Sequence, residues 1–555
     1  MNVTGLLRHL AITLLCVVAL WVTHPAPPVA WFDTTYIAHR MLETPTLLDA
    51  MRFAAGYHTY PRPARVLEWR LGARLVGESA VGYHAINVVF VGLAVWAVTW
   101  IARSMTGSAV RAAGVGAAMG VSYVTVYPLL HFPYGIQLAL ALVGFAALIA
   151  PPGPWSRART VLAVTSILVA GLAHEVFLTF TILPWLYRRW IRPLPRWSVW
   201  ACSAGLLAWL AVQLVPHAMP GAGKGLFDEG VAEHVGRVLV SLVTGGLPAE
   251  MLRLLPVAPP FTRIRASFAT VPGLLLFLGV ALPTLLLLPA ALRRPWSGRT
   301  RFLAVWLGMG SVPLLLPVGT PESYHLAGVM PALFLLWTDG YRRLAEAAHR
   351  RWAVASRGVA CVGLVAWTLA HGYARAETFH VDLQLAGRVA RSLRETIRDA
   401  PRPVVALFPP AQVGGHYGYW PILPAQRACL LEPTWVWRAA EPPRLPSACR
   451  AGDEIVVGPL DAEMERAFAG TRAMLGHPTS SAFVYHAPGE ILHHGPGEIL
   501  SVCPLRGHEA RRDAAGLWWR YRLDGVREAE VVRLELGPAP RWVKVVACGP
   551  AGVLP

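Results

Sequence analysis

A histidine–glutamate pair lies inside an apolar run of the sequence, "ILVAGLAHEVFLTFTIL" at residues 167–183. Glu175 is the only acidic residue between Glu78 and Asp228. A carboxylate in a hydrophobic segment costs free energy unless it has a partner or a function, and a carboxylate beside a reacting group can accept its proton. His174 and Glu175 are therefore candidates for a functional site.

A second candidate carboxylate, Asp33, lies about ten residues beyond the first apolar block. It is surrounded by Trp31, Phe32 and Tyr36, and aromatic residues favour the membrane–water interface. We therefore expect Asp33 near the outer surface of the membrane, where it could act as a general base.

The stretch "RPARVLEWRLGARLVG", which follows Asp33, predicts an amphipathic helix. We expect its apolar side to hold Val66, Leu67, Leu71 and Leu75. The arginines of this stretch either extend to lipid phosphates or anchor the helix at the membrane surface; they are Arg62, Arg65, Arg70 and Arg74.

The composition indicates a polytopic membrane protein. Of 555 residues, 55% are hydrophobic and only 15% charged, the mean hydropathy is +0.45, and the apolar residues form long blocks. The first block, "LAITLLCVVALWV", lacks a convincing cleavage site and is interpreted as a retained anchor. The net charge of +18 comes from arginines placed between the blocks rather than on one basic face, which argues against a nucleic-acid-binding protein.

Short connectors rich in arginine separate many of the blocks, and the positive-inside rule places five of them in the cytoplasm. They are "RSMTGSAVR", "PPGPWSRAR", "YRRWIRPLPR", "RRPWSGRTR" and "YRRLAEAAHRR". The count then gives about eleven crossings and an external C-terminus. The blocks lie near 8–23, 84–102, 112–130, 134–150, 160–173, 175–187, 198–215, 268–291, 302–318, 325–339 and 353–371.

Residues 160–187 have cytoplasmic connectors on both sides, so an even number of crossings is required. At about 1.5 Å per residue, the segment is also too long for one helix across a hydrocarbon core of about 30 Å. We therefore expect two short helices that turn at His174–Glu175, near the outer interface. The alternative is a single, strongly tilted helix.

The predicted fold is an all-α polytopic membrane domain, residues 1–371, followed by a soluble extracytoplasmic domain of mixed α/β structure, residues 372–555. The membrane domain has long outer loops at 24–82 and 216–267. In the tail, "LAGRVARSLRETIRDA" predicts an amphipathic helix, and runs such as "DEIVVGP" and "LWWRYRL" predict strands.

The tail holds an even number of cysteines in a compartment that permits disulfides. Of the three connectivities, sequential pairing is favoured, Cys429–Cys449 and Cys503–Cys548. The tail also contains the near-repeat "HAPGEILHHGPGEIL". Its histidines could bind a metal, but two Pro-Gly turns between short strands also explain the pattern.

The order of motifs in residues 1–370 resembles the bacterial GT-C glycosyltransferases, multi-spanning enzymes related to the protein O-mannosyltransferases. The resemblance begins with Asp33 in an early outer loop, then "YPRP", the amphipathic helix and the His-x-x-Asn pattern of His84 and Asn87. Three later stretches are similar to family segments: "LLHFPYGIQLALALVG" with His131, "GLAHEVFLTFTILPWLY", and "GTPESYHLAGVMPALFLLW" with Tyr324.

The chain departs from the family pattern at three places. Thr34 follows Asp33 where a second acidic residue is common, and Gly135, Ile136 and Gln137 fill the region of a glutamate in the second outer loop. His174 replaces the usual lysine before Glu175. A divergent enzyme and a member with altered chemistry both fit these departures.

The resemblance implies transfer of a sugar from a polyprenyl-phosphate donor to a glycan, lipid or protein acceptor outside the bacterial inner membrane. Asp33 would be the base of an inverting single displacement, and Arg62, or another arginine of that loop, would contact the phosphate. Glu175 and His174 would hold the first loop or bind polar groups, with supporting roles for His84, Asn87, His131 and Tyr324. The alternative for Glu175 is a purely structural turn whose carboxylate is hydrated or forms a salt bridge with an arginine of the loop. Membrane lipids are expected partners, nucleic acid is not, and no cofactor or protein metal site is assigned, although a divalent cation stays open.

Two other classes compete with this interpretation. A transporter or lipid flippase also places isolated charges within a membrane, often near the midplane of repeated halves, but the sequence shows no internal repeat and its carboxylates lie at outer ends. A non-catalytic cell-envelope assembly protein would use the outer tail for binding. The missing acidic positions favour it, whereas Asp33 and Glu175 count against it.

The topology can be tested with single cysteines introduced into a chain whose natural cysteines are replaced. We expect a membrane-impermeant maleimide to label cells at position 175 and in residues 372–555, but not in the 152–159 or 188–196 connectors, because arginine-rich connectors stay cytoplasmic. Labelling of 188–196 from outside would contradict the predicted topology.

Overall fold

The computed structural model describes residues 14–24, 26, 41, 46–51, 62–77, 79–151, 156–214, 231–247, 271–315, 323–347, 349–377 and 379, and short strands between 404 and 550. The chain divides into two compact units. The helices lie in the first unit, which ends at Glu377, and the described strands lie in the second. Asp33 lies outside the described residues.

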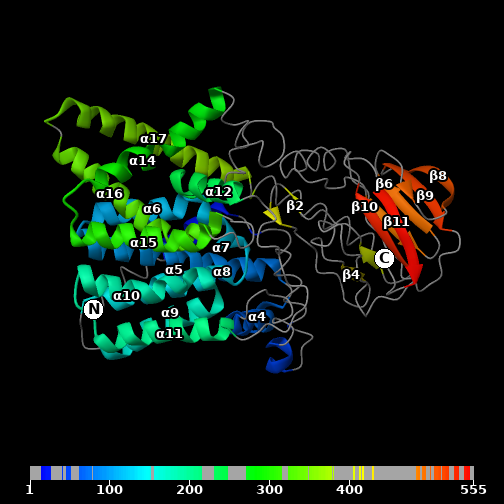
Figure 1. The fold of residues 1–555 in the computed structure, drawn as a ribbon, viewed down its shortest axis with the longest axis horizontal. Coiled ribbons are helices and arrows are strands. Elements are labelled where there is room, and N and C mark those ends of the chain that lie inside the picture. The colour runs from blue at the N-terminus through cyan, green and yellow to red at the C-terminus, as the bar shows by residue number, and fades with distance from the viewer. Residues whose placement is uncertain are drawn as a thin grey trace. The chain divides into compact units, whose positions relative to one another are not determined.

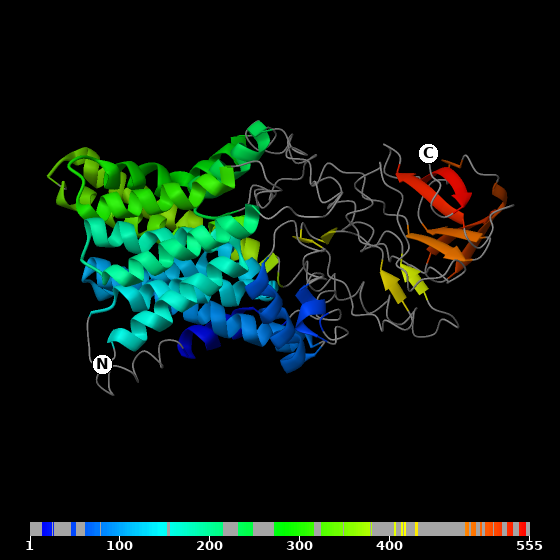
Figure 2. The same cartoon turned by 60° about the horizontal axis from the view of Figure 1, so that its bottom comes forward.

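The helical unit is a bundle of helices that run side by side (Figures 1 and 2). Its main helices are α4 (Pro63–Val76), α5 (Ala80–Thr106), α6 (Ala109–Val121), α7 (Val126–Leu130), α8 (Tyr134–Ile149), α9 (Ser156–Ala173), α10 (Thr179–Trp190), α11 (Arg196–Leu214), α12 (Val231–Val243), α14 (Val271–Leu292), α15 (Gly298–Leu315), α16 (Met330–Glu346) and α17 (Arg351–Glu377). Three short 3-10 helices are η1 (Tyr123–Thr125), η2 (Glu175–Leu178) and η4 (Ser323–Gly328).

Three described helices are long and apolar enough to cross a membrane, and a fourth span results if the bent pair Ala109–Val121 and Tyr123–Leu130 counts as one. The three are Ala80–Thr106, Ser156–Ala173 and Arg351–Ala376. Other apolar helices in the described part are shorter, for example Tyr134–Ile149. The count of eleven crossings therefore stays a prediction.

The five arginine-rich connectors meet at one end of the bundle. Arg192, after α10, donates a hydrogen bond to the Ile149 carbonyl at the end of α8, and Arg299, at the start of α15, donates to the Met105 carbonyl near the end of α5. Arg343, late in α16, donates to carbonyls of the connector before α15. Gly298, at the start of α15, lies against the carbonyl oxygen of Trp190 at the end of α10, which joins these contacts. The side of the membrane that the connectors face stays a prediction.

The predicted break at His174 is confirmed. α9 ends at Ala173, His174 has extended backbone torsions, and η2 and α10 follow. Because Arg192 contacts Ile149, the end of α10 lies at the same end of the bundle as the start of α9. The two helices therefore form a hairpin, and its turn lies about 27 Å away from the connectors, at 1.5 Å per residue of α9.

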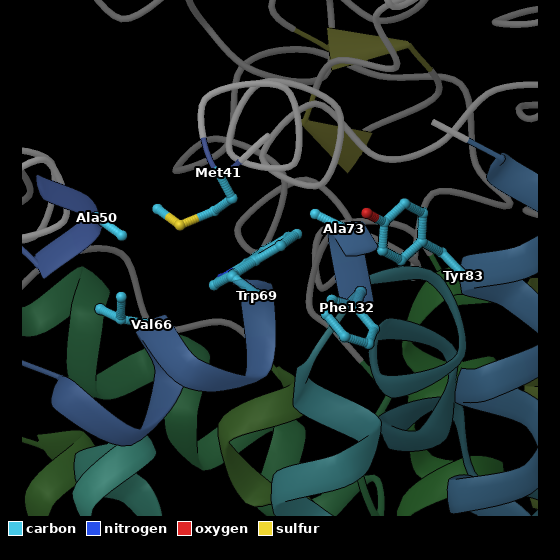
Figure 3. Packing of buried hydrophobic residues seen from close by; sticks show 7 residues of the cluster. All are labelled: Met41, Ala50, Val66, Trp69, Ala73, Tyr83 and Phe132. Atoms are coloured by element: carbon cyan, nitrogen blue, oxygen red, sulfur yellow. The ribbon is translucent and has the colours of Figure 1, made fainter. Parts of the chain in front are cut away.

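Helix α4 packs against this far end through a small apolar cluster (Figure 3). The Trp69 ring lies 5.2 Å from the ring of Phe132, which in turn lies 5.0 Å from Tyr83. Gly72 contributes because a Cβ at this position would collide with the Phe132 ring. The remaining members of the cluster are Met41, Ala50, Val66 and Ala73.

The predicted faces of α4 need a correction. Leu67, Leu71 and Leu75 are exposed, as expected for a helix at a membrane surface, but Val66 is buried on the other side. Arg65 and Arg70 are buried as well, so only Arg74 points outward as a lipid-facing arginine would. The positions of the apolar leucines set the helix orientation, and the buried arginines then need partners within the protein.

In the second unit the described elements are all strands. A four-stranded sheet has the order β5-β6-β9-β8 and a three-stranded sheet the order β10-β11-β7, with two-stranded pairs β1-β4 and β2-β3. The strands are β1 (Val404–Ala406), β2 (Gln412–Val413), β3 (His416–Tyr417), β4 (Ala428–Leu430), β5 (Phe483–Ala487), β6 (Glu490–His494), β7 (Leu500–Ser501), β8 (Leu505–Asp513), β9 (Gly516–Leu523), β10 (Glu530–Leu536) and β11 (Val543–Pro550).

The near-repeat with His486, His493 and His494 forms the antiparallel pair β5–β6, in which Ala487 faces Glu490. The first Pro-Gly pair thus joins two strands, as the turn interpretation predicted. The amphipathic helix expected near residue 390 lies outside the described residues.

The tail disulfides stay a prediction. Cys449 and Cys503 lie outside the described residues, and one member of each predicted pair is therefore not placed; Cys429 and Cys548 lie in β4 and β11. Within the described part of the chain no disulfide is found, and Cys16, Cys202 and Cys361 are free thiols.

Helices α14 and α16 approach closely at Gly340, where a Cβ would collide with the carbonyl oxygen of Leu287. We expect Gly340→Ala to destabilise the detergent-solubilised protein by about 1–3 kcal/mol, the usual cost of overpacking. Gly358 in α17 has open space around it, so Gly358→Ala should leave stability unchanged or raise it slightly. Equal thermal midpoints for the two variants would contradict this packing.

Candidate functional site

The central contact of the site is a bidentate ion pair between Arg62 and Glu175. Arg62 Nε donates to Glu175 Oε2 at 3.0 Å, and Arg62 Nη2 donates to Glu175 Oε1 at 2.5 Å. Arg62 immediately precedes α4, whose first residue, Pro63, has the fixed φ that favours this position. Burial alone would raise the pKa of Glu175, but the charge of Arg62 outweighs it and holds that pKa below its ordinary value.

His174 caps the turn that carries Glu175. Its Nδ1 accepts a 3.4 Å hydrogen bond from the Val176 amide, which closes the start of η2. Burial lowers the pKa of His174 well below its ordinary value, so the ring is neutral near pH 7. Its ring also contacts Tyr134 at 5.3 Å and His325 of η4 at 5.9 Å.

Helix α4 contributes two more polar contacts on the same side as Arg62. Arg65 Nη2 lies 3.5 Å from Nε2 of His131, and Gln137 Nε2 donates to Glu68 Oε2 at 2.6 Å. Residues three apart lie on one helix face. The spacing Arg62, Arg65, Glu68 therefore directs three polar side chains towards three different elements of the bundle.

Glu68 differs from Glu175 in charge. Among the described residues its direct partner is an amide, and burial raises its pKa to about 8, although the Gln137 hydrogen bond and the Arg65 charge partly oppose the increase. Glu68 is thus mostly protonated at pH 7, whereas Glu175 is ionised. The two carboxyl groups of the site are separated in charge state by their partners.

His84 and Asn87 brace the segment that carries His131. His84 Nδ1 lies 3.3 Å from the Leu129 carbonyl oxygen, and Asn87 Nδ2 donates to the same oxygen at 3.2 Å. The other ring nitrogen of His84 lies 2.8 Å from the carbonyl oxygen of His24. These predicted site residues therefore position the backbone just before His131.

A buried arginine, Arg375, joins the end of α17 to the bend between α6 and α7. Arg375 Nε donates to His24 Nε2 at 2.9 Å, and its Nη1 donates to the carbonyl of Ser122 at 3.0 Å and to Oγ1 of Thr125 at 2.9 Å. The bend between α6 and α7 is thus tied to α17 and, through Arg375, to His24, which follows the short apolar helix Leu14–Thr23. This group was not predicted from the sequence.

The structure brings Arg62, His174 and Glu175 into direct contact and places His131 beside them through Arg65. It leaves Asp33 and the Tyr324 side chain outside the described residues. Arg65, Glu68 and His325 were not predicted as site residues, although the Arg62–Arg65–Glu68 spacing on an expected helix contained the signal for two of them.

The described side chains around the Arg62–Glu175 pair carry a net positive charge. Arg62 and Arg65 contribute two positive charges and Glu175 one negative charge, while Glu68 and His174 are mostly neutral, which leaves +1 near pH 7. Guanidinium groups match the geometry of phosphate oxygens. The group can thus stabilise an anionic ligand without losing the contact that holds α4.

The raised pKa of Glu68 makes a pH prediction. The folded protein holds a proton that the unfolded chain releases above a pKa of about 4.5, so this group contributes less stability as the pH rises from about 4.5 to about 8. Glu68→Gln cannot ionise, and its thermal midpoint should therefore fall less between pH 5 and 8.5 than that of the wild type. Glu346→Gln, at an exposed pair with Arg342, is the control; parallel curves for wild type and Glu68→Gln would contradict the shift.

No protein-family model matches the sequence, and no curated protein does. Among solved structures, the chain is similar to ArnT from Cupriavidus metallidurans bound to undecaprenyl phosphate, with 14% identity, a TM-score of 0.40, and coverage of 77% of this chain and 86% of ArnT. It is also similar to the archaeal oligosaccharyltransferase AglB from Archaeoglobus fulgidus in complex with an inhibitory peptide and a dolichol-phosphate. The identity is 12% and the TM-score 0.38, with 72% of this chain and 59% of AglB covered.

Proposed function

We propose that the chain is a GT-C-type membrane glycosyltransferase that moves a sugar from a polyprenyl phosphate to an acceptor outside the membrane. The observation that carries the proposal is the Arg62–Glu175 pair with Arg65 beside it, at the bundle end opposite the arginine-rich connectors. This group is net positive and lies next to a helix whose exposed leucines suit a membrane surface. A lipid phosphate is the anion that such a position would meet.

In this proposal Asp33 is the general base. Its carboxylate accepts the proton of the acceptor hydroxyl while that oxygen attacks the anomeric carbon. The bond between the anomeric carbon and the phosphate oxygen breaks, and the polyprenyl phosphate leaves with the electron pair. One displacement inverts the anomeric configuration, and the phosphate needs no proton to leave.

Arg62 and Arg65 would stabilise the negative charge that gathers on the leaving phosphate. Glu175 holds Arg62 by two hydrogen bonds, so the guanidinium is oriented before the donor arrives. An ion pair that already exists costs less reorganisation than one formed during the reaction. Glu175 is therefore a positioning residue in this scheme.

The activity test uses the full chain in nanodiscs with undecaprenyl phosphates that carry different sugars, together with envelope glycans from a deletion strain. The proposal expects loss of one glycan, accumulation of one lipid-linked sugar, and glycosidic bond formation by the purified protein. Movement of a lipid across vesicles without bond formation would instead identify a flippase. The absence of both transfer and lipid movement would support an assembly protein.

Asp33 and Glu175 should respond differently to nearly isosteric changes. Asp33→Asn should lower kcat by a factor of about 10² to 10⁴, the usual contribution of acid–base catalysis. Glu175→Gln keeps part of the hydrogen bonding to Arg62 and should act more weakly, mainly on KM. Steady-state transfer assays on purified variants measure both effects.

The control for both changes is Glu346→Gln, a carboxyl variant at an exposed pair, which should transfer at the wild-type rate. Full activity of Asp33→Asn would refute the assigned base and make Glu175 the next candidate.

A further inference from the structure

The contact between Glu68 and Gln137 leaves two polar atoms unmatched. Gln137 is fully buried, and its amide nitrogen donates to Glu68 Oε2. Oε1 of Glu68 and Oε1 of Gln137 are both buried and have no hydrogen-bond partner among the described residues. Buried polar atoms without partners are uncommon in folded proteins, and each needs an explanation.

The proton of Glu68 decides which ligand group could satisfy both atoms. With burial raising its pKa to about 8, the carboxyl is mostly neutral at pH 7, and the amide already donates to Oε2, which leaves the O–H group on Oε1. The pair therefore offers one unmatched donor, on Glu68, and one unmatched acceptor, on Gln137. A hydroxyl group can accept from the first and donate to the second.

The position of the pair relates it to the arginines. Glu68 lies three residues beyond Arg65 and six beyond Arg62, which corresponds to about 4.5 and 9 Å along the axis of α4 at 1.5 Å per residue. A ligand with an anionic end and a hydroxyl-bearing end could contact both regions of one helix. A sugar attached to a phosphate has this chemistry.

We propose that Glu68 and Gln137 form a subsite that recognises a hydroxyl group of the sugar carried by the lipid phosphate. This inference rests on the proposed function, because it assumes that the phosphate lies at Arg62 and Arg65. It assigns sugar recognition to a neutral carboxyl–amide pair and phosphate recognition to the charged pair. Glu68 is in this view a specificity-determining residue and Asp33 remains the base.

The matched variants are Glu68→Gln and Glu68→Leu. A glutamine at position 68 keeps an N–H donor at the same place, whereas leucine has similar size and no donor. If the subsite binds a hydroxyl, Glu68→Gln should keep most of the sugar's contribution to affinity and Glu68→Leu should lose it. Gln137→Leu removes the acceptor and should resemble Glu68→Leu.

The measurement compares binding of bare undecaprenyl phosphate with undecaprenyl phosphates that carry glucose, mannose, galactose or arabinose, using full chain in nanodiscs. The dissociation constant of the bare lipid divided by that of the sugar-bearing lipid measures the contribution of the sugar to affinity. For the preferred sugar we expect this ratio to fall about tenfold in Glu68→Leu, the effect of one buried hydrogen bond, and less than threefold in Glu68→Gln. Affinity for bare undecaprenyl phosphate should stay within twofold of the wild type.

Three other outcomes would contradict the subsite or the proposed function. Equal losses for bare and sugar-bearing lipid, with a lower thermal midpoint, would show that the pair only holds α4 or a buried water, and would overturn the subsite. A wild-type protein that binds all sugars and the bare lipid equally would overturn it as well. A wild-type protein that binds no undecaprenyl phosphate would instead contradict the proposed function, and Glu346→Gln should match the wild type in every measurement.

Discussion

The ion pair between Arg62 and Glu175 joins the start of α4 to the turn of the α9–α10 hairpin, and the rest of the site depends on it. A carboxylate at the end of two apolar helices needs a charged partner, since an unpaired charge of this kind is strongly destabilising. Arg62 supplies that partner from the residue just before α4. The contact thereby fixes where α4 begins, and with it the positions of Arg65 and Glu68.

Helix α4 has one exposed apolar face and one face that packs on the bundle. Leu67, Leu71 and Leu75 are exposed and suit lipid, while Trp69 and Val66 pack on the bundle. The polar side chains lie on the boundary between these faces, where they meet His131, Gln137 and Glu175. Because the apolar cluster also holds α4 in place, its polar side chains can take part in a binding site without loss of that packing.

The hairpin at His174 could be predicted because length and charge left few alternatives: both connectors were arginine-rich and the segment was too long for one crossing. The directions of Arg65 and Arg70 could not, because an amphipathic pattern does not tell whether a charged side chain faces water or a buried partner. Glu68 was missed for a related reason. Its partner, Gln137, lies 69 residues away in sequence, and only the tertiary structure brings them together. In the tail, the predicted strand "LWWRYRL" lies in β9, whereas "DEIVVGP" and the cysteine pairing depend on residues beyond the described part.

The two carboxyl groups of the site, Glu68 and Glu175, have different kinds of partner. Gln137 lies in the first turn of α8, in the region where the sequence lacks an acidic residue, and the carboxyl group that meets it comes from α4. An amide opposite a carboxyl lets the acid stay neutral, whereas an arginine opposite a carboxyl keeps it ionised. The start of α4 therefore carries an ionised pair at Arg62 and a neutral pair at Glu68, six residues apart. This difference in charge along a single helix is what would allow one ligand to be oriented, with its anionic end towards the arginines and its uncharged polar end towards Glu68.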